Sequence, residues 1–234
     1  MSLINMTASH PLDRPVWSAL TTRQAPLSEG DARALRFRAE YGLFAALADG
    51  SAASLAALPG LIAPGGGVAL VEAEAPPEIP GTEIASRAGI WQMVCEALTP
   101  DDRPAEFEIV DLTDDDAPAM LALATLTEPG PFFERTHRLG QFVGVKVDGR
   151  LIAMAGERMK PGDFTEVSGV CTDPGHRGKG YAGALMRVVA GRIAARGETA
   201  FLHSYSHNTG AIALYESLGF RLRAELSMTV LRRA

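Results

Sequence analysis

The sequence lacks the features that mark secreted, membrane-spanning or metal-binding proteins. It has only two cysteines in 234 residues, Cys95 and Cys171, which are too few for a disulfide framework and stand in no metal-ligand spacing. No stretch approaches the roughly 18 consecutive apolar residues of a membrane span. The charged residues Asp13 and Arg14 stand where a signal peptide would have its apolar core. We therefore expect a soluble cytoplasmic protein that works without a metal.

An excess of positive charge is also missing. The formal net charge is −6, which argues against nucleic acid as a partner because phosphate binding needs a basic surface. Residues 1–105 carry 7 basic and 12 acidic side chains, whereas residues 106–234 carry 15 and 16. A polyanionic ligand is therefore better accommodated in the C-terminal part of the chain.

The most informative stretch is residues 170–185, where a short apolar run is followed by a glycine-rich basic turn and then by a helical pattern. The unpaired N–H groups of a helix's first turn and the helix dipole both favour an anion. Arg177 and Lys179 add positive charge, and Gly178 and Gly180 allow a phosphate to approach the backbone closely. The turn therefore predicts a binding site for a diphosphate.

Two glycine-rich segments partly match nucleotide-binding motifs, but each lacks a residue that the motif requires. The segment from Gly178 to Gly183 has the G-x-G-x-x-G spacing of a dinucleotide site, but no carboxylate ends the next predicted strand, residues 199–205. The run from Gly65 to Gly67 has no following Lys-Ser/Thr, so it predicts an ordinary loop instead of a phosphate loop.

Two ordered motifs resemble those of the GNAT superfamily of N-acyltransferases. The turn matches the R/Q-x-x-G-x-G/A loop that holds acetyl-CoA in that superfamily, and residues 208–220 match its N-x-x-A-x-x-L-Y-x-x-x-G-F segment. The resemblance covers about residues 106–234. Within the superfamily, the sequence of residues 170–177 is most similar to that of the group allied to glycine N-acyltransferases.

The resemblance implies roles for individual residues. The turn and the strand before it are expected to bind the diphosphate and to lie beside the pantetheine arm of acetyl-CoA or another acyl-CoA. These residues are Val170, Cys171, Thr172, Arg177, Gly178, Lys179, Gly180, Tyr181 and Ala182. Asn208 is either a helix cap or a further cofactor contact, and Tyr215 is the expected proton donor to the departing thiolate. We interpret Cys171 as a packed residue and not as a nucleophile, and Gly169 as a bulge or a point of close approach.

Three side chains are candidates for the general base. Glu166 is the first choice, because it lies on the strand that leads into the turn and is expected to share a face with Ser168 and Val170. The alternative for Glu166 is an exposed strand residue without a catalytic role. His203 and His207 are in reserve, because the ordinary pKa of histidine suits proton transfer near neutral pH.

The expected fold class is α/β (α+β), a GNAT-like, mostly antiparallel sheet with flanking helices. Residues 106–234 predict the order β-α-α-β-β-β-α-β-α-β-β, with a hairpin turn at Asp148-Gly149 and final strands at residues 220–223 and 227–231. The proline-rich segment 99–104 predicts a domain boundary. Residues 1–105 lack both motifs, and we expect them to be a degenerate copy of the same fold without cofactor.

Within residues 1–105 the patterns are weaker. They predict a helix over residues 32–48 capped by Ser28, a short helix at residues 55–58 and a strand at residues 68–71. Residues 90–98 fit a strand or a helix equally well.

Together these observations predict an acetyl-CoA-dependent N-acetyltransferase that acts on a primary amine by direct attack in a ternary complex. The acceptor stays open among a free amino acid, a small amine and a protein N-terminus, and so does the oligomeric state. The alternative is a non-catalytic module that binds or senses acyl-CoA.

Overall fold

The computed structural model describes residues 10–100 and 106–234, in which eleven strands form one mixed sheet. The strand order is β1-β2-β3-β4-β11-β5-β10-β9-β8-β7-β6. The strands are β1 (Ser28–Gly30), β2 (Ala34–Phe37), β3 (Phe44–Leu47), β4 (Gly67–Glu72), β5 (Thr82–Cys95), β6 (Val110–Leu112), β7 (Phe142–Val147), β8 (Arg150–Glu157), β9 (Phe164–Thr172), β10 (Thr199–Tyr205) and β11 (Arg221–Arg233). The α-helices are α1 (Pro15–Thr21), α2 (Ala52–Ala57), α3 (Ala117–Thr127), α4 (Tyr181–Ala195) and α5 (Thr209–Ser217).

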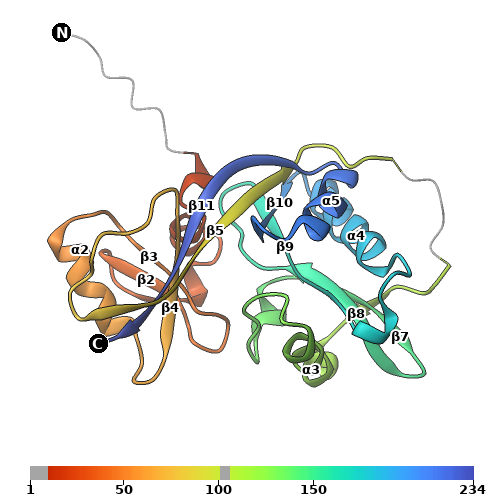
Figure 1. Ribbon diagram of the computed structural model, residues 1–234, viewed down its shortest axis with the longest axis horizontal. Coiled ribbons are helices and arrows are strands. Elements are labelled where there is room, and N and C mark those ends of the chain that lie inside the picture. Colours follow the sequence, from red (N-terminus) through yellow and green to blue (C-terminus); the bar gives the residue numbers. More distant parts are fainter. Residues whose placement is uncertain (1–9, 101–105) are drawn as a thin grey trace, which may run out of the picture.

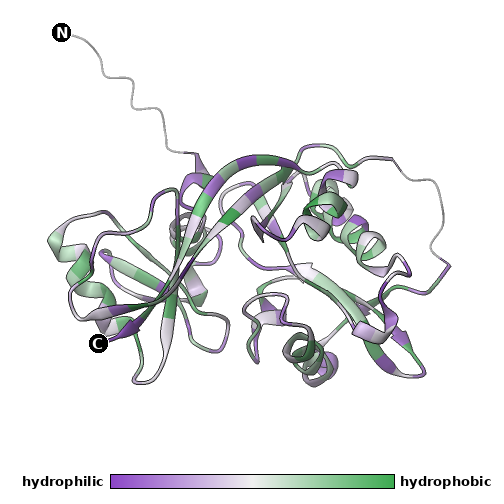
Figure 2. Cartoon of the chain, in the orientation of Figure 1, coloured by the Kyte–Doolittle hydropathy of each residue, from purple (hydrophilic) through white to green (hydrophobic). Residues whose placement is uncertain are grey.

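Two long strands join the N-terminal half (residues 10–100) to the C-terminal half (residues 106–234). β5 pairs with β10 on one side and with β11 on the other, and β11 also pairs with β4. Figure 1 shows β5 and β11 passing together from one lobe of the molecule to the other. Hydrophobic and hydrophilic residues alternate along β11 in Figure 2, as expected of a strand with one face on a core. Each half therefore supplies a strand to the sheet of the other.

The C-terminal half has the predicted sheet with helices on both faces. β7, β8 and β9 are consecutive antiparallel strands, and Asp148 and Gly149, both with positive φ, form the predicted turn between β7 and β8. α4 and α5 cover one face and α3 covers the other (Figure 1). The predicted GNAT-like fold of this half is confirmed.

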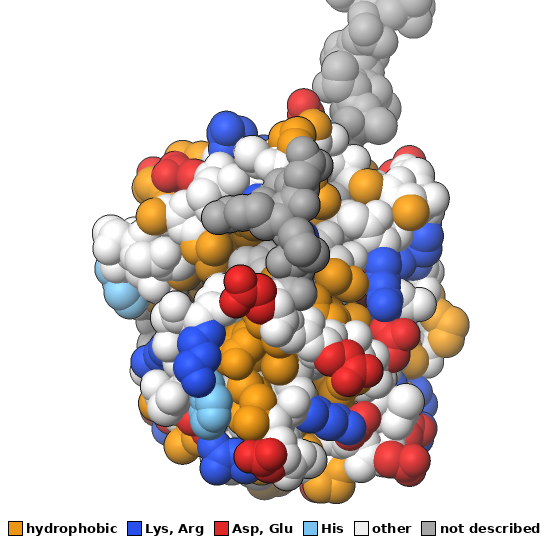
Figure 3. Space-filling view, turned by 90° about the vertical axis from the view of Figure 1, so that its right-hand side faces the viewer, with side chains coloured by type: hydrophobic (Ala, Val, Ile, Leu, Met, Phe, Trp, Pro, Cys, Tyr) orange, Lys and Arg blue, Asp and Glu red, His pale blue; other side chains and the backbone are white. Residues whose placement is uncertain are grey.

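The surface of this half carries charges of both signs. Figure 3 shows the end of the molecule near α4 and β7, where acidic and basic side chains are interspersed around exposed hydrophobic ones. This mixture agrees with the nearly balanced charge of residues 106–234.

Apolar side chains from both halves share one core cluster. Leu12, Phe37 and Phe44 of the N-terminal half pack in the same cluster as Phe201 and Leu226 of the C-terminal half. The predicted boundary at residues 99–104 lies mostly outside the described residues, so the two-domain division stays a prediction. A boundary there would divide a core and a sheet that both halves share.

The helix predicted over residues 32–48 is wrong. The segment forms β2 and β3, separated by a turn in which the Tyr41 N–H donates to the Arg38 carbonyl. Ser28, its predicted cap, begins β1 instead. All four residues of β3 are buried, and a strand covered on both faces reads as a continuous apolar run that cannot be told from a helical stripe.

Smaller differences concern strand ends. Within the open segment 90–98, the residues up to Cys95 form the end of strand β5, and the first strand of the C-terminal half is β6. The two final predicted strands are a single strand, β11, whose register shifts between Leu222 and Ala224. That irregularity interrupts the alternation and explains the apparent break. The short helix near residues 55–58 and the strand at residues 68–71 are confirmed as α2 and β4.

Candidate active site

The site begins where two parallel strands separate. β9 and β10 are paired only between Phe164–Glu166 and Thr199–Phe201, although both strands continue beyond these residues. Among the described residues, the edge of β9 after Glu166 that faced β10 has no further strand partner. Backbone donors and acceptors on this edge are therefore available to an extended ligand lying between the strands.

The turn after β9 has the geometry that the sequence predicted for an anion site. Asp173 accepts a hydrogen bond from the Gly175 N–H at 2.9 Å, and Gly178 and Gly180 both have φ of 79°. A Cβ placed on either glycine would meet no atom within 4 Å. The backbone N–H groups of residues 177–180 have no acceptor within the described part of the chain, and α4 begins directly after them. The turn thus presents unpaired donors to open space at a helix N-terminus.

A long groove of about 480 Å³ lies along this turn and the separated strands. All ten predicted cofactor residues and Tyr215 line it. They come from β9 (Val170, Cys171 and Thr172), the turn (Arg177, Gly178, Lys179 and Gly180), α4 (Tyr181 and Ala182) and the α5 cap (Asn208). Neither Arg177 nor Lys179 has a salt bridge with another described residue, so both charges are available to a ligand. These residues fit a diphosphate attached to a long arm.

Gly169 forms the bulge that the sequence suggested. It has φ of 63°, and the β8–β9 register shifts so that Ser168 faces Gly156 while Cys171 faces Met154. The extra residue reverses the side-chain alternation beyond it. As a result Val167 and Val170 both pack on the core beneath α4, and Glu166 does not share a face with Val170. The prediction that Glu166 shares a face with Val170 was wrong because it ignored this bulge.

Both cysteines are free and buried. Burial raises the pKa of the Cys171 thiol to about 11, so the thiol stays protonated at neutral pH. Cys171 lines the groove as a small packed residue and contacts the cluster beneath α3. A protonated buried thiol is a poor nucleophile, in agreement with the sequence interpretation.

Tyr215 and Asn208 stand at the end of the groove. The Asn208 side chain caps α5 by accepting from the Ala211 N–H at 3.4 Å, and Asn208 also lines the groove, so both of its suggested roles are compatible with the structure. Burial raises the pKa of the Tyr215 hydroxyl above its ordinary value. The hydroxyl therefore keeps its proton at neutral pH and is available as a donor.

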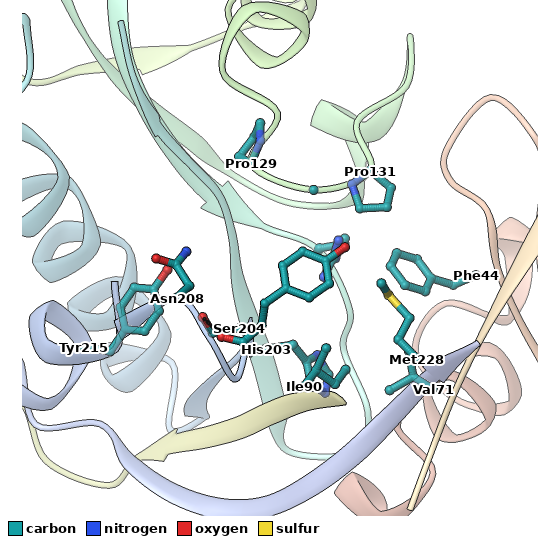
Figure 4. Close-up of a pocket in the computed structure, with 13 residues that line it drawn as sticks. Phe44, Val71, Ile90, Pro129, Pro131, His203, Ser204, Asn208, Tyr215 and Met228 are labelled. Carbon is teal, nitrogen blue, oxygen red and sulfur yellow. Dashed lines mark hydrogen bonds between the residues drawn. The ribbon is translucent and has the colours of Figure 1, made fainter. Parts of the chain in front are cut away.

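A second, smaller pocket of about 90 Å³ meets the groove at Tyr215; we call it the inner pocket. Pro129, Tyr205, Asn208 and Tyr215 line both spaces. Figure 4 shows Tyr215 and Asn208 on one side of the inner pocket, with Phe44, Val71 and Met228 on the opposite side. The remaining lining residues are Ile90, Gly130, Pro131, Arg158, His203 and Ser204. Both halves of the chain therefore build the inner pocket.

Glu166, the first-choice base, is fully buried and lines neither the groove nor the inner pocket. Its two carboxylate oxygens accept from Nε and Nη2 of Arg158 at 2.8 and 2.7 Å, and His203 Nδ1 lies 2.8 Å from Oε1. Burial raises the pKa of Glu166, but Arg158 and His203 outweigh it and hold the pKa well below its ordinary value. A carboxylate so stabilised is a weak proton acceptor.

The reserve candidates differ in their positions. His203 is held between Glu166 and Gln92, whose Nε2 lies 3.1 Å from His203 Nε2, and it lines the inner pocket. His207 is exposed, stacks on Tyr205 with ring centroids 5.4 Å apart, and lines neither space. His203 is thus the candidate that the structure brings to the site.

Sequence reasoning missed Arg158 and the N-terminal residues of the inner pocket. Arg158 and Glu166 stand at equal distances from Gly162 in the turn between β8 and β9, and this opposite-charge symmetry could have indicated a cross-strand pair. No such signal marks Phe44 or Val71, because they read as ordinary strand residues and reach the pocket only through the tertiary fold.

Comparisons with known proteins agree with this geometry. The family model described as FR47-like protein matches residues 142–228, from β7 into β11. A crystal structure from Novosphingobium aromaticivorans, described as an acetyltransferase of the GNAT family, is 46% identical, covers 96% of this chain and 99% of its own, and superposes with a TM-score of 0.90. A GCN5-related N-acetyltransferase from Kribbella flavida, 19% identical over 92% of this chain and 93% of its own, has the same fold with a TM-score of 0.65.

The fold and the groove define an acyltransferase of mixed α/β architecture. The chain belongs to the GNAT family of acetyltransferases. A search of the curated proteins found no match. In the described residues, no helix is long and apolar enough to cross a membrane, and no group of His, Cys, Asp and Glu side chains is arranged to hold a metal ion.

Proposed function

We propose that this protein is an acetyl-CoA-dependent N-acetyltransferase that transfers the acetyl group to a primary amine by direct attack in a ternary complex. The observation that carries the proposal is the junction of the long groove with the inner pocket at Tyr215. A donor in the groove and an amine in the pocket would meet beside a protonated hydroxyl. Positioning two reactants in this way contributes several kcal/mol to catalysis.

The chain's own residues would do three things. The N–H groups of residues 178–182 bind the diphosphate, with Arg177 and Lys179 adding charge. The open edge of β9 orients the extended arm. Tyr215 keeps its hydroxyl proton at neutral pH and donates it to the departing sulfur.

When bound, acetyl-CoA supplies a thioester carbonyl and a thiol leaving group. The amine nitrogen forms a bond to the carbonyl carbon while the carbon–sulfur bond breaks. Tyr215 gives its proton to the sulfur, the amine releases one proton to solvent, and Tyr215 regains one proton from solvent, so that the products are an amide and free coenzyme A. Glu166 is better suited to orient Arg158 and His203 than to accept the amine proton itself, because Arg158 occupies both of its oxygens.

Thiol release from acetyl-CoA in the presence of pooled amino acids, small amines and short peptides tests the proposal. Amine-dependent release that falls in a Tyr215→Phe variant is the expected result. Tight binding of acetyl-CoA without release under any amine would instead favour a module that binds or senses acyl-CoA. Repeating the assay with longer acyl-CoA donors tests the choice of acetyl.

Two finer assignments from the sequence stay proposals. The grouping of this protein with the glycine N-acyltransferases is based on the sequence of residues 170–177. The cytoplasmic location is based on the amino-acid composition. Two free buried cysteines suit a reducing compartment.

A further inference from the structure

The Arg158 side chain is rigidly held at the wall of the inner pocket. It is 9% exposed, and Glu166 engages its Nε and Nη2 side. The guanidinium carbon lies over the Phe44 ring, 4.6 Å from its centroid. A guanidinium held by a carboxylate and by an aromatic ring loses little freedom when it binds a ligand at its remaining edge.

The backbone of Arg158 is fixed as well. Its N–H donates to the Glu166 carbonyl at 3.0 Å, and its carbonyl accepts from Gln24 Nε2 at 2.7 Å. The buried Gln24 also accepts from the Lys160 N–H at 2.9 Å. Gln24 belongs to the N-terminal half, so the position of Arg158 depends on the contact between the halves.

One edge of the guanidinium is left for a ligand. Of its five N–H donors, Glu166 takes two, and Nη1 has no hydrogen-bond partner among the described residues. The Nη1–Nη2 edge matches the two oxygens of a carboxylate. Arg158 is thus a nearly buried donor with unused capacity at the inner pocket.

Part of the pocket wall is apolar. Phe44, Val71 and Met228 line the side away from Tyr215, Ile90 lies between the two sides, and Pro129 and Pro131 close another side (Figure 4). Such a wall favours an apolar body between two polar ends.

We propose that the inner pocket binds the acceptor as an amino carboxylic acid, with its carboxylate on the free edge of Arg158 and its amino group toward Tyr215. The inference rests on the proposed acetyltransferase function and names the class of acceptor. In this arrangement Glu166 and Phe44 are positioning residues, because they hold the guanidinium in place without touching the acceptor.

The test compares amino acids with the amines that lack their carboxylate. α-Amino acids with small apolar side chains and ω-amino acids of increasing length are each paired with the decarboxylated amine, and kcat/KM is measured by thiol release. A ratio of at least about tenfold in favour of the acid is expected for the best pair, as for a hydrogen bond to a charged group at a nearly buried site. A ratio near one for every pair overturns the inference.

An Arg158→Lys variant keeps the charge beside Glu166 but loses the flat edge. It should bring the ratio to within about twofold of unity, chiefly by raising KM for the acid. Arg192→Lys on α4, which breaks only a surface contact with Asp111, is the matched control and should leave the ratio unchanged. An unchanged ratio in Arg158→Lys contradicts the inference.

The two failures are distinguishable. Thiol release with neutral amines or peptides but not with amino acids preserves the acetyltransferase proposal and rejects the carboxylate site. If no amine releases thiol, the acetyltransferase proposal fails, and calorimetric titration of the amino acids into the protein loaded with coenzyme A decides the carboxylate site. Binding that Arg158→Lys weakens at least about tenfold supports it, and the lack of any binding rejects it.

Discussion

At the scale of single residues, the structure separates the two side chains that the sequence predicted for catalysis, Tyr215 and Glu166. Tyr215 reaches both the groove and the inner pocket, whereas Glu166 is sealed beneath Arg158. Sequence position alone could not show this difference, because the sequence does not reveal whether a charged strand residue forms a buried ion pair or faces a cavity. The bulge at Gly169 reverses the side-chain faces between the two ends of β9.

Replacing Tyr215 with Phe should lower kcat about 100-fold and leave KM for acetyl-CoA within about twofold, because only a proton donor is lost. The raised pKa of Tyr215 means that wild-type activity should persist into alkaline solution and fall only above pH 10, the ordinary value for tyrosine. Steady-state kinetics across pH measure both effects. Tyr41 lines neither the groove nor the inner pocket, so Tyr41→Phe should leave kcat unchanged. An unchanged kcat in Tyr215→Phe would exclude the hydroxyl from the mechanism.

Replacing Glu166 with Gln should lower the free energy of unfolding at pH 7 by about 3 kcal/mol, because Arg158 would stay charged and nearly buried without its partner. The folded pKa of Glu166 lies below its ordinary value of 4.5, so its stabilising contribution is present above pH 4.5 and is lost as the pH falls toward the folded value. The difference between wild type and variant should therefore be smaller at pH 3 than at pH 7.

Urea unfolding at the two pH values measures this difference. Glu225→Gln, at an exposed position on β11, is the control and should change stability little at either pH. An equal loss for Glu166→Gln at pH 3 and pH 7 would show that the carboxylate is not held ionised by Arg158.

At the scale of elements, the turn between β9 and α4 is where sequence and structure agree best. Glycines, cations and a following helix specify this turn locally, and all ten predicted cofactor residues line one groove. The error over residues 32–48 has the opposite cause. The apolar residues of this segment form strands because they are buried between both halves, and no local sequence pattern indicates that burial.

Alanine at Gly178 or Gly180 should weaken binding of coenzyme A at least about tenfold, because a Cβ would enter the space where the diphosphate approaches the backbone. Each change should also lower stability by about 1–2 kcal/mol, because φ of 79° is unfavourable for alanine.

Gly197 offers a matched control for that experiment. It has φ of 77° and open space around it, but it lies just beyond the other end of α4 and does not line the groove. Gly197→Ala should cost similar stability and leave the affinity for coenzyme A unchanged, as measured by thermal unfolding and calorimetric titration. Equal loss of affinity in all three variants would mean that general destabilisation, and not the groove, controls binding.

At the scale of the whole molecule, the order of strands in the two halves is similar. Each half has a parallel pair, β3–β4 and β9–β10, with a helix between its strands and antiparallel neighbours on the outer side. The strand that follows each pair, β5 or β11, crosses to the other half. This arrangement is what a degenerate copy with exchanged strands would produce. Superposition of the halves tests that prediction, and unrelated helix and strand positions would reject it.

The shared sheet and core lead to an expectation about unfolding. Because β5 and β11 pair across the halves and one apolar cluster contains residues of both, heating should unfold the protein in a single transition with equal calorimetric and van't Hoff enthalpies. Scanning calorimetry measures both quantities. Two separated transitions would show that the halves fold as independent domains.

The sequence could not predict the inner pocket, although it predicted the groove beside it. The groove is lined mainly by residues of the two sequence motifs, whereas the pocket combines Phe44 and Val71 with Arg158 and Met228, which meet only in the folded chain. A site of this kind can be recognised only when the positions of both halves in the folded chain are known. The N-terminal half thus forms one wall of the proposed acceptor site.

The most direct test of the account is a crystal structure of the protein with coenzyme A bound. We expect the diphosphate within hydrogen-bonding distance of the N–H groups of residues 178–182, the arm along the open edge of β9, and the sulfur beside the Tyr215 hydroxyl at the mouth of the inner pocket. A diphosphate bound elsewhere, or a sulfur remote from Tyr215, would contradict it.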